Sequence, residues 1–113
     1  MTASESDLLA VLGYVFLQNA RPDKAAVVFA ALDVMEPGRP QVLRSLVIAQ
    51  LRCGKVTKAL ETLDRLAMTG GVDAAFHLLR TQAMGMSNRR EEAAASMKTY
   101  IHLRQAAATG PVP

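Results

Sequence analysis

Residues 25–37, AAVVFAALDVMEP, carry the pattern from which the rest of the chain can be read. Residues 59–71, ALETLDRLAMTGG, repeat its main features, and residues 93–105, AAASMKTYIHLRQ, repeat them again at the same separation. We call this constant separation the repeat period. A fixed period shared by several positions indicates tandem structural repeats. The equivalent residues are Ala25, Ala59 and Ala93, then Phe29, Leu63 and Met97, and then Leu32, Leu66 and Tyr100.

The same period extends into the segment before each of these stretches. Leu9 and Leu12 lie one repeat period before Leu43 and Leu46. Apolar residues three positions apart lie on one side of a helix, so they are predicted to face the helix that follows. The recurring alanine suits a close crossing of two helix backbones, and the bulky residue one turn later fills the core. Pro37 ends the first unit, because proline cannot continue a helix.

We therefore predict an all-α protein of three tandem helix-turn-helix repeats. The repeat domain is predicted to cover residues 6–108, with disordered segments at residues 1–5 and 109–113. Arg80 stands where leucine is expected, so the first helix of the third repeat is expected to be shifted by about one residue. The predicted repeats are 6–39, 40–73 and 74–107, and the predicted helices are 6–20, 23–36, 40–53, 56–68, 74–87 and 90–107.

The repeat period, about 34 residues, and the residue types resemble the tetratricopeptide repeat, or TPR, pattern. The first unit matches best, with Gly13, Phe16, Ala25, Phe29 and Pro37 at positions typical of the family. The resemblance implies a short right-handed solenoid. It also implies a concave side, lined by the first helix of each pair, that binds a segment of another protein.

Composition and charge narrow the classes of function. The chain has a net charge of +3, spread along its 113 residues, and one cysteine, Cys53. A lone cysteine excludes an internal disulfide and fits a reducing compartment. No apolar run approaches the roughly 20 residues of a membrane span, and residues 1–7 lack the features of a secretory signal. These features predict a cytoplasmic protein.

Catalytic and metal-binding motifs are not found in the sequence. His77 and His102 have no cysteine or acidic residue at metal-ligand spacing around them. The pair Gly70 and Gly71 is followed by valine and aspartate, which does not fit a phosphate-binding loop. We therefore expect no enzymatic activity, no metal and no cofactor.

The alternative from another class is a helix-turn-helix DNA-binding protein. Arg39, Arg44, Arg52, Lys55 and Lys58 make the middle of the chain basic. A DNA-binding protein would gather base-reading residues on one helix, which this chain does not do, and the repeat period would remain unexplained. We expect no nucleic-acid partner.

Beyond the repeat, the chain resembles the small TPR chaperones of bacterial type III secretion systems, of the YscY (SctY) kind. The residues that carry this likeness are LAVLGYVFLQ at 9–18, AALDVMEP at 30–37 and YIHLR at 100–104. The resemblance implies a cytosolic chaperone that forms a heterodimer with a small export partner of the YscX (SctX) kind. Such a chaperone helps to deliver its partner to the export gate in the inner membrane without inserting into the membrane itself.

Related classes remain open. Needle-subunit co-chaperones have a similar size, and a generic TPR interaction module differs only in its partner. Translocator chaperones carry an additional N-terminal helical segment, and this chain has little before Ser6, which counts against that class.

The position of each residue within its repeat predicts whether it lines the concave side, and we call this assignment the repeat frame. Apolar residues on the concave side would contact a partner helix, and arginines there would pair with its acidic residues. Asp7, Ala75 and Met86 are also predicted to point inward. The predicted contact residues are Ala10, Tyr14, Leu17 and Gln18 in the first repeat, Gln41, Arg44, Ile48, Leu51 and Arg52 in the second, and Leu78 and Gln82 in the third.

Several of these residues have a second interpretation. Leu17 and Leu51 can equally pack between neighbouring repeats, and Arg44 and Arg52 can equally be solvated. Tyr14 and Ile48 are favoured as partner contacts. The sequence alone does not show which side of a helix its neighbours cover, so these alternatives stay open.

Overall fold

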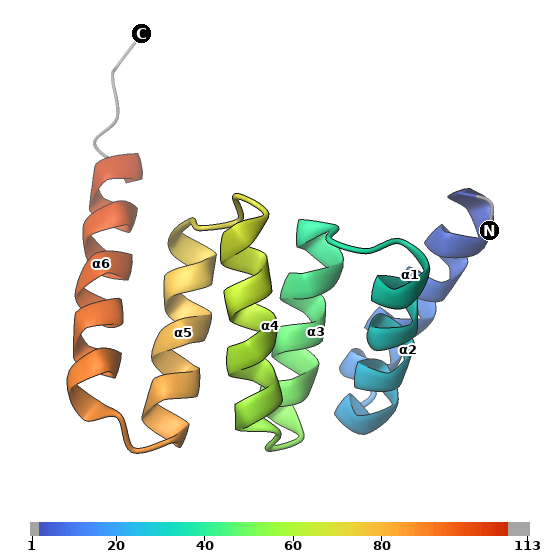
Figure 1. Ribbon diagram of the computed structural model, residues 1–113, viewed down its shortest axis with the longest axis horizontal. Coiled ribbons are helices and arrows are strands. Elements are labelled where there is room, and N and C mark those ends of the chain that lie inside the picture. The colour runs from blue at the N-terminus through green and yellow to red at the C-terminus, as the bar shows by residue number, and fades with distance from the viewer. Residues whose placement is uncertain (1–2, 109–113) are drawn as a thin grey trace, which may run out of the picture.

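The computed structural model describes residues 3–108, which form six helices. Consecutive helices lie side by side in chain order, from α1 at one end of the molecule to α6 at the other (Figure 1). The all-α tandem-repeat fold predicted from the sequence is confirmed. The helices are α1 (Ala3–Gln18), α2 (Pro22–Met35), α3 (Pro40–Arg52), α4 (Val56–Met68), α5 (Ala74–Met86) and α6 (Arg90–Ala108).

The helix starts follow the period of the sequence. Helices α2, α4 and α6 begin at Pro22, Val56 and Arg90, and α3 and α5 begin at Pro40 and Ala74. The starts of α4, α5 and α6 therefore each lie one repeat period after the equivalent start in the preceding repeat. The expected shift of the third repeat is wrong, because α5 keeps the same register as α3.

In the third repeat, Arg80 takes the place of the leucine that packs in the second repeat, and it contacts α6 through polar groups. Its Nη1 donates to the Ser96 hydroxyl of α6 at 2.5 Å, and its Nη2 lies 3.7 Å from the Glu92 carboxylate. The contact between α5 and α6 is therefore partly polar, and the only side chain that α6 buries among the described residues is Ser96.

The turn inside each repeat has the same backbone geometry. Ala20, Gly54 and Asn88, which are equivalent positions of the three repeats, all have a left-handed conformation, with φ of 57°, 79° and 60°. In the first repeat the next residue, Arg21, donates its backbone N–H to the Phe16 carbonyl oxygen at 2.7 Å. This pattern is typical of a helix that ends in a Schellman motif. The repeated turn gives every helix pair the same connection.

The predicted boundaries differ from the structure at the N-terminus. The segment 1–5 was expected to be disordered, but α1 begins at Ala3. Glu5 lies in the first turn, where a negative charge is favoured by the helix dipole. Residues 1–2, and the tail 109–113 that was also expected to be disordered, lie outside the described residues.

Two buried clusters form the core, and α3 contributes to both. In the first cluster α3 packs against α2 and the inner side of α1. In the second, the other side of α3 packs against α4 and α5. The first cluster contains Ala25, Ala26, Phe29, Leu32, Val42, Leu46 and Ala49, and the second contains Leu43, Val47, Leu51, Ala59, Leu63, Leu66, Phe76, Leu79 and Ala83.

A close approach of α1 to α2 depends on Gly13. This buried glycine lies directly against the Phe29 ring, which has no exposed surface. A Cβ atom at position 13 would lie 2.6 Å from Phe29 Cζ, well inside van der Waals contact. Glycine is therefore required at this crossing for steric reasons.

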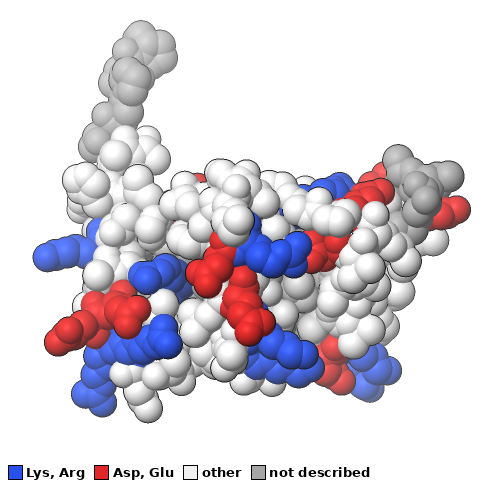
Figure 2. Space-filling model, in the orientation of Figure 1, with Lys and Arg blue, Asp and Glu red and all other residues white. Residues whose placement is uncertain are grey.

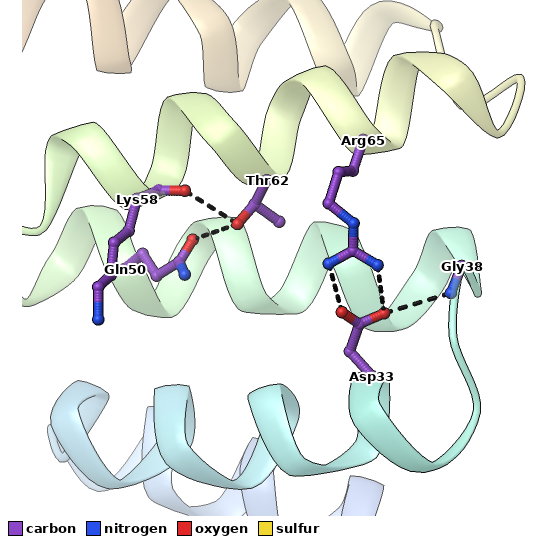
Figure 3. A network of polar contacts seen from close by, with 6 residues as sticks. All are labelled: Asp33, Gly38, Gln50, Lys58, Thr62 and Arg65. Atoms are coloured by element: carbon purple, nitrogen blue, oxygen red, sulfur yellow. Dashed lines mark hydrogen bonds and ion pairs between the residues drawn. The ribbon is translucent and has the colours of Figure 1, made fainter.

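An ion pair between the half-exposed Arg65 and the buried Asp33 joins the second repeat to the first (Figure 3). Both guanidinium Nη atoms of Arg65, from α4, bond the carboxylate of Asp33, which is buried on α2. The Gly38 backbone N–H also donates to Asp33 Oδ1, at 3.2 Å. The hydrogen bonds from Arg65, more than its charge, hold the pKa of Asp33 below its ordinary value, in spite of burial.

A second polar contact lies inside the second repeat. The Thr62 hydroxyl of α4 lies 2.9 Å from the Gln50 side-chain oxygen of α3 and 2.9 Å from the Lys58 carbonyl oxygen (Figure 3). The side chains of Thr62 and Gln50 are buried. Buried polar groups need such partners, because an unsatisfied one destabilises the fold.

Gly13→Ala tests the close approach of α1 to α2. The added methyl group must displace the Phe29 ring, so we expect the free energy of unfolding to fall by about 1–3 kcal/mol. Gly85→Ala, in α5, is the matched control, because a Cβ there meets no atom within 4 Å. That variant should be neutral or more stable by up to about 1 kcal/mol. Equal urea-unfolding midpoints for the two variants would contradict the steric explanation.

Asp33→Asn tests the ion pair between repeats. Because folding lowers the pKa of Asp33, the carboxylate stabilises the fold above its ordinary pKa of 3.8, and this stabilisation disappears as the pH falls through the folded-state pKa. We expect the variant to be less stable by about 1–2 kcal/mol at pH 7, since Arg65 is half exposed. Denaturant titrations at several pH values should show this difference shrinking below about pH 4. A constant difference down to pH 2.5 would contradict it.

Candidate partner-binding groove

An open groove of about 670 Å³ lies between α3 and α5, the first helices of the second and third repeats. Its surface is mainly apolar, with the basic side chain of Arg52 and the polar side chains of α5 among its lining. A groove of this shape suits an amphipathic helix or an extended segment. It is lined by Ile48, Leu51, Arg52, Leu79, Thr81, Gln82, Gly85 and Met86.

Four predicted contact residues meet in this groove. Ile48, Leu51 and Arg52 come from α3, and Gln82 comes from α5. Ile48 is half-buried at the edge of the second core cluster, while Arg52 and Gln82 are exposed. Leu51 is a member of that cluster and is almost fully buried, so it forms the floor of the groove and packs within the repeat stack.

A smaller pocket of about 310 Å³ lies between α1 and α3, and three more predicted residues line it. They are Ala10, Tyr14 and Gln41. The Tyr14 hydroxyl accepts a hydrogen bond from Ser45 Oγ at 3.1 Å, and its ring lies edge-on to Phe29, with 5.3 Å between ring centroids. Tyr14 is thus held within the junction of the first two repeats.

The two predicted arginines differ in their surroundings. Arg44 Nη1 lies 3.1 Å from Asp73 Oδ2, so this side chain bridges α3 and the start of α5. Asp73 also accepts the Phe76 backbone N–H at 2.9 Å and so caps α5. Arg52 makes no ion pair with any residue between 3 and 108, and its charge therefore remains available to a partner.

Four predicted residues line neither of these two hollows, namely Arg44, Leu17, Gln18 and Leu78. Leu17 is half-buried against the first core cluster, and Gln18 is exposed at the end of α1. Leu78 is half-buried on α5. These positions were placed inward by the repeat frame, but they lie to the side of the groove.

The groove also contains residues that the sequence did not predict. Leu79, Thr81 and Gly85 line it from α5, together with Met86, which the repeat frame does turn inward. Gly85 is the equivalent of Leu51 in the next repeat, so the frame contained this position.

Charges of both signs are interleaved on the face shown in Figure 2. Lysine and arginine side chains stand beside aspartate and glutamate over α4 to α6, and over α1 and α2 the charged side chains lie toward the helix ends, with an uncharged stretch between them. This face has no basic stripe of the kind that follows a nucleic-acid backbone.

The remaining polar groups form no cluster with evident chemistry. No three His, Cys, Asp or Glu side chains in the described part of the chain lie together as metal ligands would. His77 Nδ1 is buried and has no hydrogen-bond partner, and its ring lies edge-on to Phe76. Within residues 3–108, no helix is both long enough and apolar enough to cross a membrane.

The fold and the groove define a helical-repeat module for protein–protein interaction. A family model of the tetratricopeptide repeat matches residues 8–83, which is more than half of the chain. The chain therefore belongs to the tetratricopeptide repeat family. No protein with a curated description matches it.

Leu51→Ala and Gln82→Ala separate the floor of the groove from its exposed side. Leu51 is in the core, so its truncation should lower the free energy of unfolding by about 2–5 kcal/mol. Gln82→Ala should change stability by no more than about 0.5 kcal/mol. Chemical denaturation measures both values. If Leu51→Ala lowers the free energy of unfolding no more than Gln82→Ala does, Leu51 is a surface contact and not a core residue.

Proposed function

We propose that this protein is a cytoplasmic chaperone of a bacterial type III secretion system that binds a small export partner of the YscX (SctX) kind. The observation that carries the proposal is the open, mainly apolar groove between α3 and α5. The sequence resemblance to the YscY (SctY) chaperones supplies the kind of partner. In this proposal the protein is not an enzyme and requires no cofactor, metal or nucleic acid.

The groove suits one amphipathic segment of the partner. Ile48 and Met86 offer apolar contacts from opposite helices, and Arg52 offers a positive charge beside them. A partner helix with apolar residues at every third or fourth position and an acidic residue at one side would complement this arrangement. Arg44, which is paired with Asp73, acts in this proposal by fixing α5 relative to α3.

Binding of this kind would serve export by shielding the partner. The apolar face of a small export protein is prone to aggregate while it waits in the cytoplasm, and the groove would cover it. The chaperone would also gain stability from the complex, because a ligand that binds only the folded state raises the free energy of unfolding. Release would then take place at the export gate in the inner membrane.

Ile48→Glu tests the groove. The introduced carboxylate would replace an apolar contact and would pair with Arg52 one turn away, so that this charge is no longer available to the partner; binding of the export partner should weaken at least tenfold, with helicity unchanged. Val27→Glu is the matched control, because Val27 is exposed on α2 at the position where the second repeat has Glu61. Co-expression with the small secreted protein encoded beside the chaperone, followed by isothermal titration calorimetry of the purified pair, measures both. Equal affinities for the two variants would exclude the groove.

The same experiment tests the identity of the partner. A one-to-one complex with the neighbouring export protein and a raised melting temperature would support the YscX-type assignment. Binding to the needle subunit instead would assign the protein to the needle-subunit co-chaperones. If the chaperone and both candidates migrate separately, the type III assignment is wrong and the interaction module has another partner.

A further inference from the structure

The two ends of the repeat stack expose apolar faces that have counterparts inside the stack. At one end, α1 carries a stripe of apolar residues that point away from α2, and we call this stripe the head face. Leu8 is 71% exposed and Leu12 is 42% exposed. Leu12, which was predicted to face the following helix, therefore faces outward. The head face consists of Leu8, Val11, Leu12 and Val15.

The repeat frame shows what the head face is built to contact. The equivalent positions of the second repeat belong to α3, where Val42 is 5% exposed and Leu46 is 4% exposed. These residues are buried because they pack on α2, the second helix of the preceding repeat. The equivalent residues of α5, among them Phe76 and Ala83, are buried with residues of α4 in the same way. The head face is thus the one copy of this docking surface that remains uncovered in the described residues.

The opposite end exposes the complementary surface. In α2 and α4, the face on which the first helix of the next repeat packs has Phe29 and Leu63 at its centre. These two residues are 0% and 2% exposed. Their equivalent in α6, Met97, is 37% exposed, and Ile101, one turn further on, is 47% exposed. A shallow groove of about 510 Å³ lies over this part of α6. We call its lining the tail face, which consists of Ala94, Ala95, Met97, Lys98 and Ile101.

The charges beside the head face are acidic, and those within the tail face and beyond it are basic. Glu5 and Asp7 are the only charged residues of α1 in the described chain. The tail face contains Lys98, and Arg104 follows one turn beyond Ile101, whereas the acidic Glu91 and Glu92 lie in the first turn of α6, before the tail face begins. Opposite charges at the edges of two apolar surfaces favour one orientation of docking and speed up association.

We infer that the head face of one molecule docks on the tail face of a second copy, as α3 docks on α2. The two faces lie at opposite ends of the molecule (Figure 1), so the contact is heterologous and each added copy offers a new free face. The assembly therefore grows with concentration and continues the solenoid from copy to copy. The groove between α3 and α5 stays open, so this inference does not depend on the proposed export partner.

Two variants, each blocked at one end, test this directly. Leu12→Glu blocks the head face, and Ile101→Glu blocks the tail face. Sedimentation velocity of the full chain over a hundredfold range of concentration should show a mass that rises above that of a dimer. Each variant alone should remain a monomer. An equimolar mixture of the two should form a heterodimer of twice the monomer mass, because one intact head and one intact tail remain.

Control variants distinguish this contact from association through another surface. Val34→Glu, at a highly exposed position of α2, should assemble like the unmodified chain. Ile48→Glu should also assemble, since the concave groove takes no part. A monomer at every concentration would overturn the inference. A dimer that Leu12→Glu abolishes and Ile101→Glu preserves would overturn it as well, because it would show a symmetric contact between two head faces.

Discussion

Helix α3 buries two opposite apolar sides at once, and the other helices are arranged around that constraint. Val42, Leu46 and Ala49 pack toward the first repeat, and Leu43 and Val47 pack toward α4 and α5. A helix with a single apolar stripe would end the stack at that point, whereas one with two stripes must be covered from both sides. Both α3 and α5 pack against α4 in the second cluster, and the sides of α3 and α5 that α4 does not cover line the groove.

Apolar packing weakens toward the end of the chain, and polar contacts partly replace it. Neither buried cluster includes a residue of α6. Arg80 and Ser96 form a short hydrogen bond where the second repeat has Leu46 and Thr62, and His77 replaces the buried Leu43. In a linear stack each repeat is stabilised mainly by its neighbours, so the last helix pair has the least support. This distribution explains why α6 retains an apolar face that a further helix can cover.

The proposed functions use separate surfaces of the molecule. In the proposed function, the open groove between α3 and α5 accepts a segment of a partner, while the outer sides of α4 and α6 carry interleaved charges. The head and tail faces lie on other helices, α1 and α6. In these proposals, occupation of one surface leaves the others accessible, because the surfaces lie on different helices.

Helix boundaries and the fold follow from local signals in the sequence, and the details of the groove do not. The repeat period, the prolines at Pro22 and Pro40 and the turn residues place most helix ends within two residues, because each signal acts on neighbouring backbone groups. The frame also selected Ile48, Arg52 and Gln82, which line the groove. Three features required the tertiary structure, namely the burial of Leu51, the bridge from Arg44 to Asp73 and the pair of Asp33 with Arg65. The two ion pairs join residues 29 and 32 positions apart, and each one links a helix of one pair to the neighbouring pair or to its N-cap, so they depend on how one helix pair is oriented on the next. That orientation is set by the shapes of many packed side chains together, which no short stretch of sequence specifies.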